Sequence, residues 1–232
     1  MIIFHSTDLT KQKGSLIEEE FRHCAKVLRY TVGDAIHLTD GKGLLATGVV
    51  SKIEKRSVLV DIDQMEHHEE LAPHIRVAVS FPKNAARVDF LIEKLVELGV
   101  NKISPIVSHH SERRKLKLER LRKKIVSAST QSGHMHFPVI DELVTLKTLL
   151  ASIDHSSCLY CHYQDKNPQL ITSDIKGKEA TIIIGPEGDF SKQELTMMND
   201  FGIKAVNIGN HRLRTETAAI AACTIWRMMN EN

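Results

Sequence analysis

The stretch Thr181-Ile-Ile-Ile-Gly-Pro-Glu-Gly-Asp-Phe-Ser191 decides the fold. Residues 180–184 form a short, largely β-branched apolar run, which predicts a buried strand. The strand cannot continue through Gly185-Pro186, because proline fixes its own φ and has no N–H. Ser191, followed three residues later by Glu194, is a capping box and predicts a helix. A strand that enters such a loop and then a helix is typical of a binding site in a parallel α/β sheet, although a plain tight turn would have the same sequence.

A second strand and loop follow at Ala205-Val-Asn-Ile-Gly-Asn-His-Arg-Leu-Arg-Thr-Glu-Thr-Ala218. Residues 205–208 predict a short buried strand that Gly209 ends. A long apolar helix should begin near Leu213 and end near Asn230. We expect the two loops to lie on adjacent strands and to form one site at the carboxyl edge of the sheet.

Charged residues stand at the start of this last helix. Thr215 is a plausible cap, and Glu216 suits the positive end of the helix dipole. Arg214 does not suit that end, so its presence there calls for an anionic partner, either a side chain or a ligand.

The two loops resemble the signature of the RsmE-type 16S rRNA (uracil-N3)-methyltransferases of the SPOUT superfamily, through Ile184-Gly-Pro-Glu-Gly188, Ile208-Gly209 and Leu213-Arg-Thr-Glu-Thr-Ala218. The stretches His23–Arg29 and Gln131–Pro138 are similar to further elements of that family, so the resemblance covers almost the whole chain. It implies an α/β fold with a C-terminal SPOUT-type trefoil-knotted parallel sheet domain, preceded by a small PUA-like β-barrel domain that binds RNA.

The resemblance implies an enzyme that uses S-adenosylmethionine to methylate N3 of a specific uridine in 16S rRNA of the small ribosomal subunit. Arg214 is the candidate for holding the uracil anion or a phosphate, and Glu216 or a water for accepting the N3 proton. The implied cofactor-binding residues lie in the two loops and at the end of a preceding strand: His162, Ile184, Gly185, Pro186, Glu187, Gly188, Ile208, Gly209, Leu213, Arg214, Thr215, Thr217 and Ala218. The family also implies a homodimer built on the helix at residues 217–229.

Four positions depart from the family pattern. Lys26, His134 and His211 stand where Arg is usual, and Asp189 stands where Gly is usual. We expect Arg212 to point away from the site, so that it does not replace the missing charge at His211. The departures at His134, His211 and Asp189 keep open a noncatalytic RNA-binding or ribosome-assembly protein that retains the fold. A nucleotide-binding protein is disfavoured, because the chain has no Gly-x-x-x-x-Gly-Lys-Ser/Thr loop.

Composition is that of an ordinary globular protein. The 232 residues are 42% hydrophobic and 26% charged, with a net charge of +2, so an RNA surface must come from local clustering. No stretch has the length of a membrane span or of a signal peptide, and we expect a cytoplasmic protein.

The chain divides by pattern into two parts. Residues 1–68 predict a small β domain, with a helix over 18–28, a hairpin around Asp40–Gly43 and a strand over 57–62. Residues 64–73 are polar and predict the linker. The second domain spans residues 74–232.

A βαβ unit opens the second domain. Strands are predicted over 75–81 and 102–107, joined by a helix that Asn84 caps and Gly99 ends, which favours a parallel sheet.

A basic segment follows at His109–Lys124. It contains eight Lys and Arg residues against Glu112 and Glu119, which is too unequal for internal salt bridges and predicts a surface for RNA phosphates. A solvated helix face is the alternative. The candidate RNA-binding residues are Lys26, Arg29, Arg113, Arg114, Arg120, Lys123 and Lys124.

Cys158-Leu-Tyr-Cys161-His162 matches a haem-attachment pattern and half of a zinc site. The stretch predicts a strand, in which side chains three residues apart face opposite sides. The two thiols could not then share a ligand, so we predict no metal and no haem.

Overall fold

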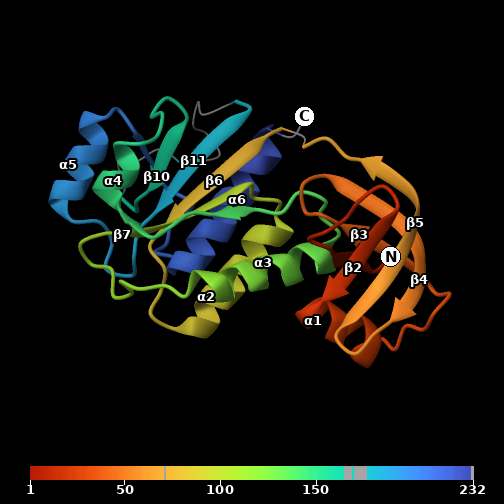
Figure 1. The fold of residues 1–232 in the computed structure, drawn as a ribbon. Helices are drawn as coiled ribbons and strands as arrows, with labels where there is room; N and C mark the ends of the chain where they lie inside the picture. The colour runs from red at the N-terminus through yellow and green to blue at the C-terminus, as the bar shows by residue number, and fades with distance from the viewer. Residues whose placement is uncertain (71, 165–168, 170–176, 231–232) are drawn as a thin grey trace. The chain divides into compact units, whose positions relative to one another are not determined.

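The computed structural model describes residues 1–70, 72–164, 169 and 177–230. The chain forms two compact units (Figure 1). The N-terminal unit comprises Met1–Glu70 and Val126–Phe137, and the C-terminal unit comprises Leu71–Ile125 and Pro138–Asn232.

The inclusion of Val126–Phe137 in the N-terminal unit has a local cause. Gly43 N–H donates to the Met135 carbonyl at 2.9 Å, and the ring of Phe137 lies 5.2 Å from that of His5. A Cβ on Gly41 would come within 2.6 Å of the Phe137 ring. The hairpin glycine is therefore needed for this packing as well as for its positive φ of 71°.

The N-terminal unit is a five-stranded sheet in the order β1-β3-β4-β5-β2. Its strands are β1 (Ile3–His5), β2 (Lys13–Ile17), β3 (Ala35–Thr39), β4 (Leu44–Ile53) and β5 (Ser57–His67). The predicted hairpin is confirmed as β3 and β4. β5 runs five residues beyond the predicted end at residue 62, because its ladder with β4 continues to His67. Ser6 links the two edges of the sheet, since its Oγ donates to the Ser15 carbonyl at 2.8 Å.

The predicted helix at residues 18–28 is present but changes type. α1 (Glu18–Phe21) continues into a π-helix, η1 (Arg22–Val27), in which Leu28 N–H reaches the His23 carbonyl five residues back. Phe21 and Cys24 pack into the core of the unit. Arg29 follows with a φ of 59°, an uncommon conformation for a residue with a side chain.

The C-terminal unit is a parallel sheet in the order β12-β10-β11-β6-β7-β8, with β9 paired to β7. The strands are β6 (His74–Val79), β7 (Lys102–Val107), β8 (Val139–Ile140), β9 (Val144–Thr145), β10 (Cys158–Cys161), β11 (Glu179–Ile184) and β12 (Lys204–Val206). The βαβ unit and its parallel pairing are confirmed. The expectation that the two loop-bearing strands are adjacent is wrong, because β10 lies between β11 and β12.

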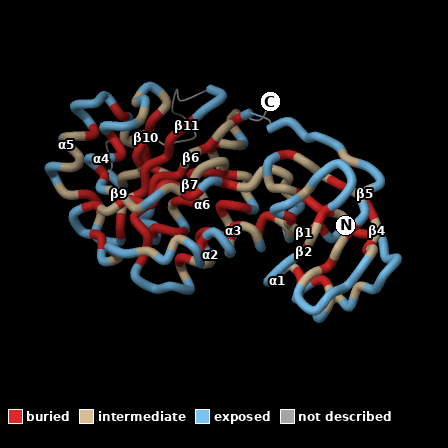
Figure 2. The backbone as a smooth tube through the Cα atoms, in the orientation of Figure 1, coloured by how far each residue is buried: buried red, intermediate tan, exposed pale blue. Residues whose placement is uncertain are grey.

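Helices cover both faces of this sheet (Figures 1 and 2). They are α2 (Ala85–Glu97), α4 (Leu146–Leu150), α5 (Lys192–Asp200) and α6 (Thr215–Asn230), and the chain also forms α3 (Leu118–Ser132), which begins in this unit and ends in the N-terminal unit. α6 packs against α2, β6 and β11, whereas α4 and α5 contribute Leu149, Leu150 and Met198 to the core on the other face. None of the helices among the described residues is both long and apolar enough to cross a membrane.

The predicted caps of two helices are confirmed. Asn84 Oδ1 accepts from Ala86 N–H at 2.8 Å at the start of α2, and Ser191 forms the capping box with Glu194 at the start of α5. Thr215 is not a cap, because it is the first residue of α6 and its Oγ1 donates to the Gly185 carbonyl at 3.1 Å. This hydrogen bond joins the two loops to each other.

Candidate functional site

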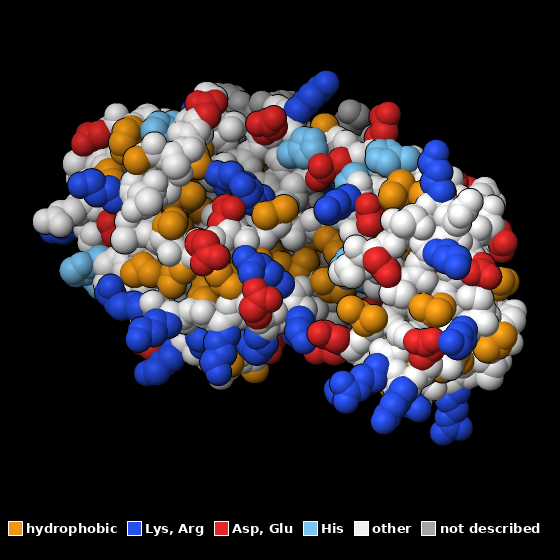
Figure 3. All heavy atoms as spheres, in the orientation of Figure 1, with side chains coloured by type: hydrophobic (Ala, Val, Ile, Leu, Met, Phe, Trp, Pro, Cys, Tyr) orange, Lys and Arg blue, Asp and Glu red, His pale blue; other side chains and the backbone are white. Residues whose placement is uncertain are grey.

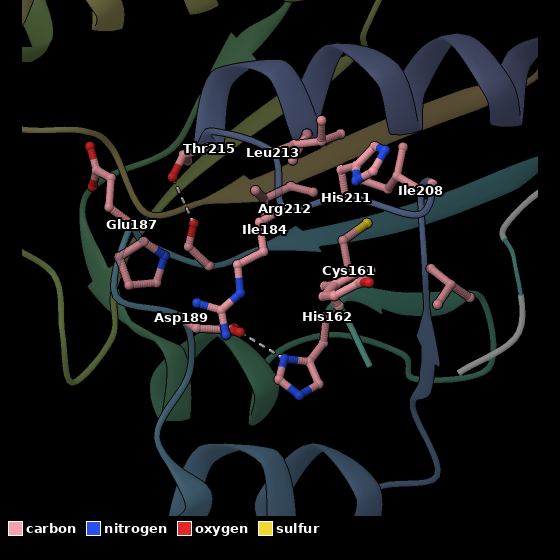
Figure 4. Close-up of a pocket in the computed structure, with 16 residues that line it drawn as sticks. Cys161, His162, Ile184, Glu187, Asp189, Ile208, His211, Arg212, Leu213 and Thr215 are labelled. Atoms are coloured by element: carbon pink, nitrogen blue, oxygen red, sulfur yellow. Dashed lines mark hydrogen bonds and ion pairs between the residues drawn. The ribbon is translucent and has the colours of Figure 1, made fainter. Parts of the chain in front are cut away.

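A cavity lies at the carboxyl ends of β10, β11 and β12 (Figure 4). It encloses about 720 Å³ of space, part of which is open solvent. The segments that follow the three strands form its walls. The lining residues are Cys161, His162, Tyr163, Ile184, Gly185, Pro186, Glu187, Asp189, Val206, Ile208, Gly209, His211, Arg212, Leu213, Thr215 and Ala218.

The first loop turns tightly after β11. Asp189 N–H donates to the Pro186 carbonyl at 2.9 Å and closes the turn. A Cβ on Gly185 would stand 3.1 Å from the Phe190 ring, so this position has little room for a side chain. The loop therefore presents backbone to the cavity at Gly185.

Asp189 occupies a left-handed conformation, with a φ of 63°. Such a φ favours glycine, which explains why glycine would be usual here, but aspartate tolerates it better than most residues. The carboxylate is held on both oxygens: Oδ1 accepts from Phe190 N–H at 2.8 Å, and Oδ2 is 2.9 Å from His162 Nδ1. Asp189 thereby fixes the orientation of His162, whose side chain is only 10% exposed.

Gly188 has a packing role. A Cβ at this position would come within 2.9 Å of the His110 Cβ. The bare Cα lets the segment after β7 approach the loop, and His110 Nδ1 then lies 2.9 Å from the Asp189 carbonyl. His109 N–H also donates to Glu194 Oε1 at 2.8 Å, which ties the same segment to α5.

Arg87 on α2 joins both loops. Its Nε and Nη2 donate to the two carboxylate oxygens of Glu216 at 2.8 and 2.6 Å, and Nη1 donates to Glu187 at 3.0 Å. Burial raises the pKa of Glu216, but the hydrogen bonds from Arg87 outweigh it and the pKa is lowered. A carboxylate so paired is poorly suited to accept a proton near neutral pH.

The structure brings most of the predicted cofactor residues together. Ten of the thirteen line the cavity, and Gly188, Arg214 and Thr217 do not. The lining also includes Cys161, Tyr163, Asp189, Val206, His211 and Arg212, which were not predicted as cofactor contacts. The expectation that Arg212 points away from the site is wrong. The signal that could have found Cys161 and Tyr163 was their position beside His162 at the end of a predicted strand.

The two cysteines of the haem-like pattern are separated as predicted. Cys158 packs in the core of the sheet face that carries α4 and α5, whereas Cys161 lines the cavity. All four cysteines are free thiols. In the described part of the chain no group of His, Cys, Asp or Glu side chains is arranged to hold a metal ion.

The candidate RNA-binding residues of the N-terminal unit lie at and after η1. Lys26 Nζ is 5.9 Å from the centre of the Phe21 ring, and Arg29 has the positive φ described above. These two side chains stand outside the core of the unit.

Three cations of the basic segment form ion pairs, so the unequal count of charges does not leave the segment without salt bridges. Arg120 pairs with Asp89 of α2 at 2.8 Å, Lys124 pairs with Glu93 of α2, and Arg122 pairs with Glu119 and Glu142. Glu119 lies within the segment, but Asp89, Glu93 and Glu142 lie outside it, and counting charges within the segment could not reveal them. Figure 3 shows acidic and basic side chains interleaved over α2 and α3.

The remaining cations of the segment differ from one another. Arg113 donates to the backbone carbonyls of Pro82 and Lys83, and Arg114 donates to the His109 carbonyl. Lys115 and Lys117 form no ion pair within the described residues. Both side chains are exposed.

Comparison with known proteins gives consistent matches over the whole chain. A family described as an RNA methyltransferase domain matches residues 69–227, and one described as an RNA methyltransferase PUA domain matches residues 16–63. The ribosomal RNA small subunit methyltransferase E of Rickettsia conorii is 28% identical over 236 residues, covering 100% of this chain and 96% of that protein.

Two solved structures are similar along their length. A probable rRNA-methyltransferase from Porphyromonas gingivalis is 32% identical with a TM-score of 0.89, covering 99% of this chain and 100% of that one. A ribosomal RNA small subunit methyltransferase E from Neisseria gonorrhoeae, bound to S-adenosyl methionine, is 28% identical with a TM-score of 0.89, covering 99% and 98%. With a family match over residues 69–227, these likenesses show that the chain belongs to the RNA methyltransferase family.

Proposed function

We propose that this chain transfers a methyl group from S-adenosylmethionine to N3 of a uridine in 16S rRNA of the small ribosomal subunit. The observation that carries the proposal is the cavity at the carboxyl edge of the sheet, which the two loops that resemble the family signature line together with the end of β10. The names of the relatives support ribosomal RNA as the substrate, and the ligand of the Neisseria gonorrhoeae structure supports the methyl donor.

The residues of the cavity fit an S-adenosyl group. Ile184, Ile208 and Leu213 offer apolar surface for an adenine ring, and Gly185 and Gly209 offer backbone. A Cβ on Gly209 would meet nothing within 4 Å, so the space beside it is open for a ligand. When bound, this cofactor supplies a methyl group on a positively charged sulfonium.

The protein must then prepare the uridine. N3 of uracil carries a proton at neutral pH and becomes a nucleophile as that proton leaves. The expected contributions are positioning of the base and stabilisation of the developing negative charge. Because both carboxylate oxygens of Glu216 accept hydrogen bonds from Arg87, we propose that Glu216 orients the loops and that water takes the N3 proton.

Two finer features accompany the proposal. We propose that the path of the chain through the two loops forms the trefoil knot of the SPOUT superfamily, which is supported by the place of β10 between β11 and β12. We also propose a homodimer, which is supported by an exposed apolar side chain near the end of α6: Met228 is 75% exposed.

The direct test is mass spectrometry of the nucleosides of 16S rRNA from cells with and without this gene. We expect 3-methyluridine to be lost in its absence and restored by the gene. No 5-methyluridine or 2′-O-methyluridine should depend on it. If 3-methyluridine is unaffected, and purified protein binds small-subunit RNA without modifying it, the noncatalytic assembly protein replaces the enzyme.

A further inference from the structure

The cations near the cavity are not equivalent. Arg87 is neutralised by Glu216 and Glu187. Arg214, the residue that the sequence favoured, and Arg212 are both exposed, but Arg214 lies outside the lining of the cavity. Arg212 lines the cavity and forms no ion pair with any described residue. It is therefore the cation that could meet an anionic group entering this space.

The backbone around Arg212 is anchored on both sides. Tyr163 Oη donates to the Asn210 carbonyl at 3.1 Å before it, and Thr215 Oγ1 holds the Gly185 carbonyl after it. Figure 4 shows the side chain of Arg212 extending from the loop before α6 across the cavity, toward the side where Asp189 and His162 lie.

The nearby carboxylate is already engaged. Asp189 accepts from Phe190 N–H and is hydrogen-bonded to His162. No ion pair joins it to Arg212 among the described residues, so the guanidinium keeps its donors for a ligand. A guanidinium offers five N–H donors in a plane and matches a planar anion better than a lysine does.

We propose that Arg212 is a catalytic residue, whose guanidinium binds the uracil as negative charge develops on its imide. The inference rests on the proposed function. In the step, the N3 proton leaves to water, the N3 electron pair forms the bond to the methyl carbon, and the pair of the broken sulfur–methyl bond stays on sulfur. The negative charge is shared by N3 and the two flanking carbonyl oxygens, and Arg212 remains protonated throughout.

The test compares Arg212→Ala, Arg212→Lys and Arg214→Ala with the full-length wild type, on small-subunit RNA or particles that lack the modification. The rate of a single turnover is measured with RNA and S-adenosylmethionine both saturating. Removal of one preorganised donor to a developing anion costs about 10²–10³ in rate. We expect such a loss for Arg212→Ala, little recovery in Arg212→Lys, and a smaller loss for Arg214→Ala.

Two further readouts exclude a purely structural role. The affinity for S-adenosylmethionine, measured by calorimetry, should change by less than about threefold, which is under 0.7 kcal/mol. The rise of the rate with pH should move to higher pH in Arg212→Ala, because a cation beside the imide favours its ionised form. Lys192→Ala, which removes an exposed cation at the start of α5, serves as the matched control and should leave the rate and its pH profile unchanged.

The results that would contradict the proposed function differ from those that would contradict the role of Arg212. If wild-type protein transfers no methyl group, the proposed function fails. If wild type is active and Arg212→Ala keeps half of its rate, the role of Arg212 is wrong. The role is also wrong if Arg212→Ala loses mainly affinity for S-adenosylmethionine, or mainly affinity for RNA at an unchanged saturating rate.

Discussion

Arg87 is the residue on which the two loops depend. From α2, its guanidinium binds Glu216 at the start of α6 and Glu187 in the loop after β11, so it joins three segments that are far apart in the sequence. Glu216 is only 8% exposed as a side chain, so loss of its charge would leave a buried part of Arg87 without its main acceptor.

This pairing predicts a stability effect with a defined pH dependence. Because the folded pKa of Glu216 is lowered, its contribution is fully present above the ordinary value of 4.5 and is lost as the pH falls through the lower folded value. Glu216→Gln should reduce the free energy of unfolding at pH 7 by about 2 kcal/mol, the range for hydrogen bonds to charged groups. Urea unfolding at several pH values measures it, and the difference from wild type should shrink below pH 4.5. An equal difference at every pH would refute the assignment.

Gly209 and Gly188 form a matched pair for testing the cofactor site. The valine side chain of Gly209→Val enters open space, so the unliganded variant should melt at the wild-type temperature. The same side chain should occupy the part of the cavity that the cofactor needs. Gly188→Ala collides with His110 and should lower that temperature without entering the lining. At a hundredfold excess over its dissociation constant, S-adenosylhomocysteine should stabilise wild type by about 2.7 kcal/mol, or about 5–10 °C.

The ligand shift separates the two variants. It should vanish in Gly209→Val and persist in Gly188→Ala, and ATP and NAD should produce none in wild type. Differential scanning fluorimetry measures all of these. A full shift in Gly209→Val would show that the cofactor lies elsewhere.

At the scale of elements, local sequence was informative where local chemistry decides the structure. Asn84 and the Ser191–Glu194 capping box marked two helix starts correctly, because a cap is made by residues close in sequence. The order of the strands could not be read in this way. The place of β10 between β11 and β12 depends on pairing between distant segments, and so does its contribution of Cys161 and Tyr163 to the cavity.

The prediction about the charges of the basic segment was wrong for the same reason. The count of cations and acids within the segment was correct. Asp89 and Glu93, however, lie on α2 and pair with Arg120 and Lys124, and a count within the segment does not include them. Likewise, Arg212 and Arg214 are two residues apart, and only the turn into α6 decides which of them lines the cavity.

The basic segment at His109–Lys124 predicts how the affinity for RNA depends on salt concentration. A cation that meets a phosphate releases counterions, so each lost contact lowers the slope of log affinity against log salt concentration by about 0.7–0.9. Lys115→Ala with Lys117→Ala should lower the slope for small-subunit RNA by up to roughly 1.5 in total. Arg120→Ala should change it less, because Asp89 already holds that charge. Filter binding from low to moderate salt measures the slopes. If only Arg120→Ala lowers the slope, the assignment of the two lysines is wrong.

At the scale of the whole molecule, the faces of α6 differ. Ala219, Ala222, Cys223 and Trp226 are buried against the chain's own sheet and α2. The apolar residues Ile220, Ala221 and Ile225 are only partly buried, and Met228 is 75% exposed. α6 is therefore apolar on more than the side that packs against its own core. A second copy of the chain could cover the remaining apolar surface.

We predict a homodimer because the partly buried and exposed apolar residues of α6 leave a surface that a second copy could cover. Light scattering after size exclusion should give about twice the monomer mass of 26.1 kDa at micromolar concentration. Met228→Glu should shift the protein toward monomer without unfolding it, because its side chain is already exposed and a charge there opposes only association. Val27→Glu, at a 67% exposed position in the N-terminal unit, is the control and should stay dimeric. A wild-type mass of one chain across the concentration range would remove the dimer, and a Met228→Glu dimer of unchanged affinity would place its interface away from the end of α6.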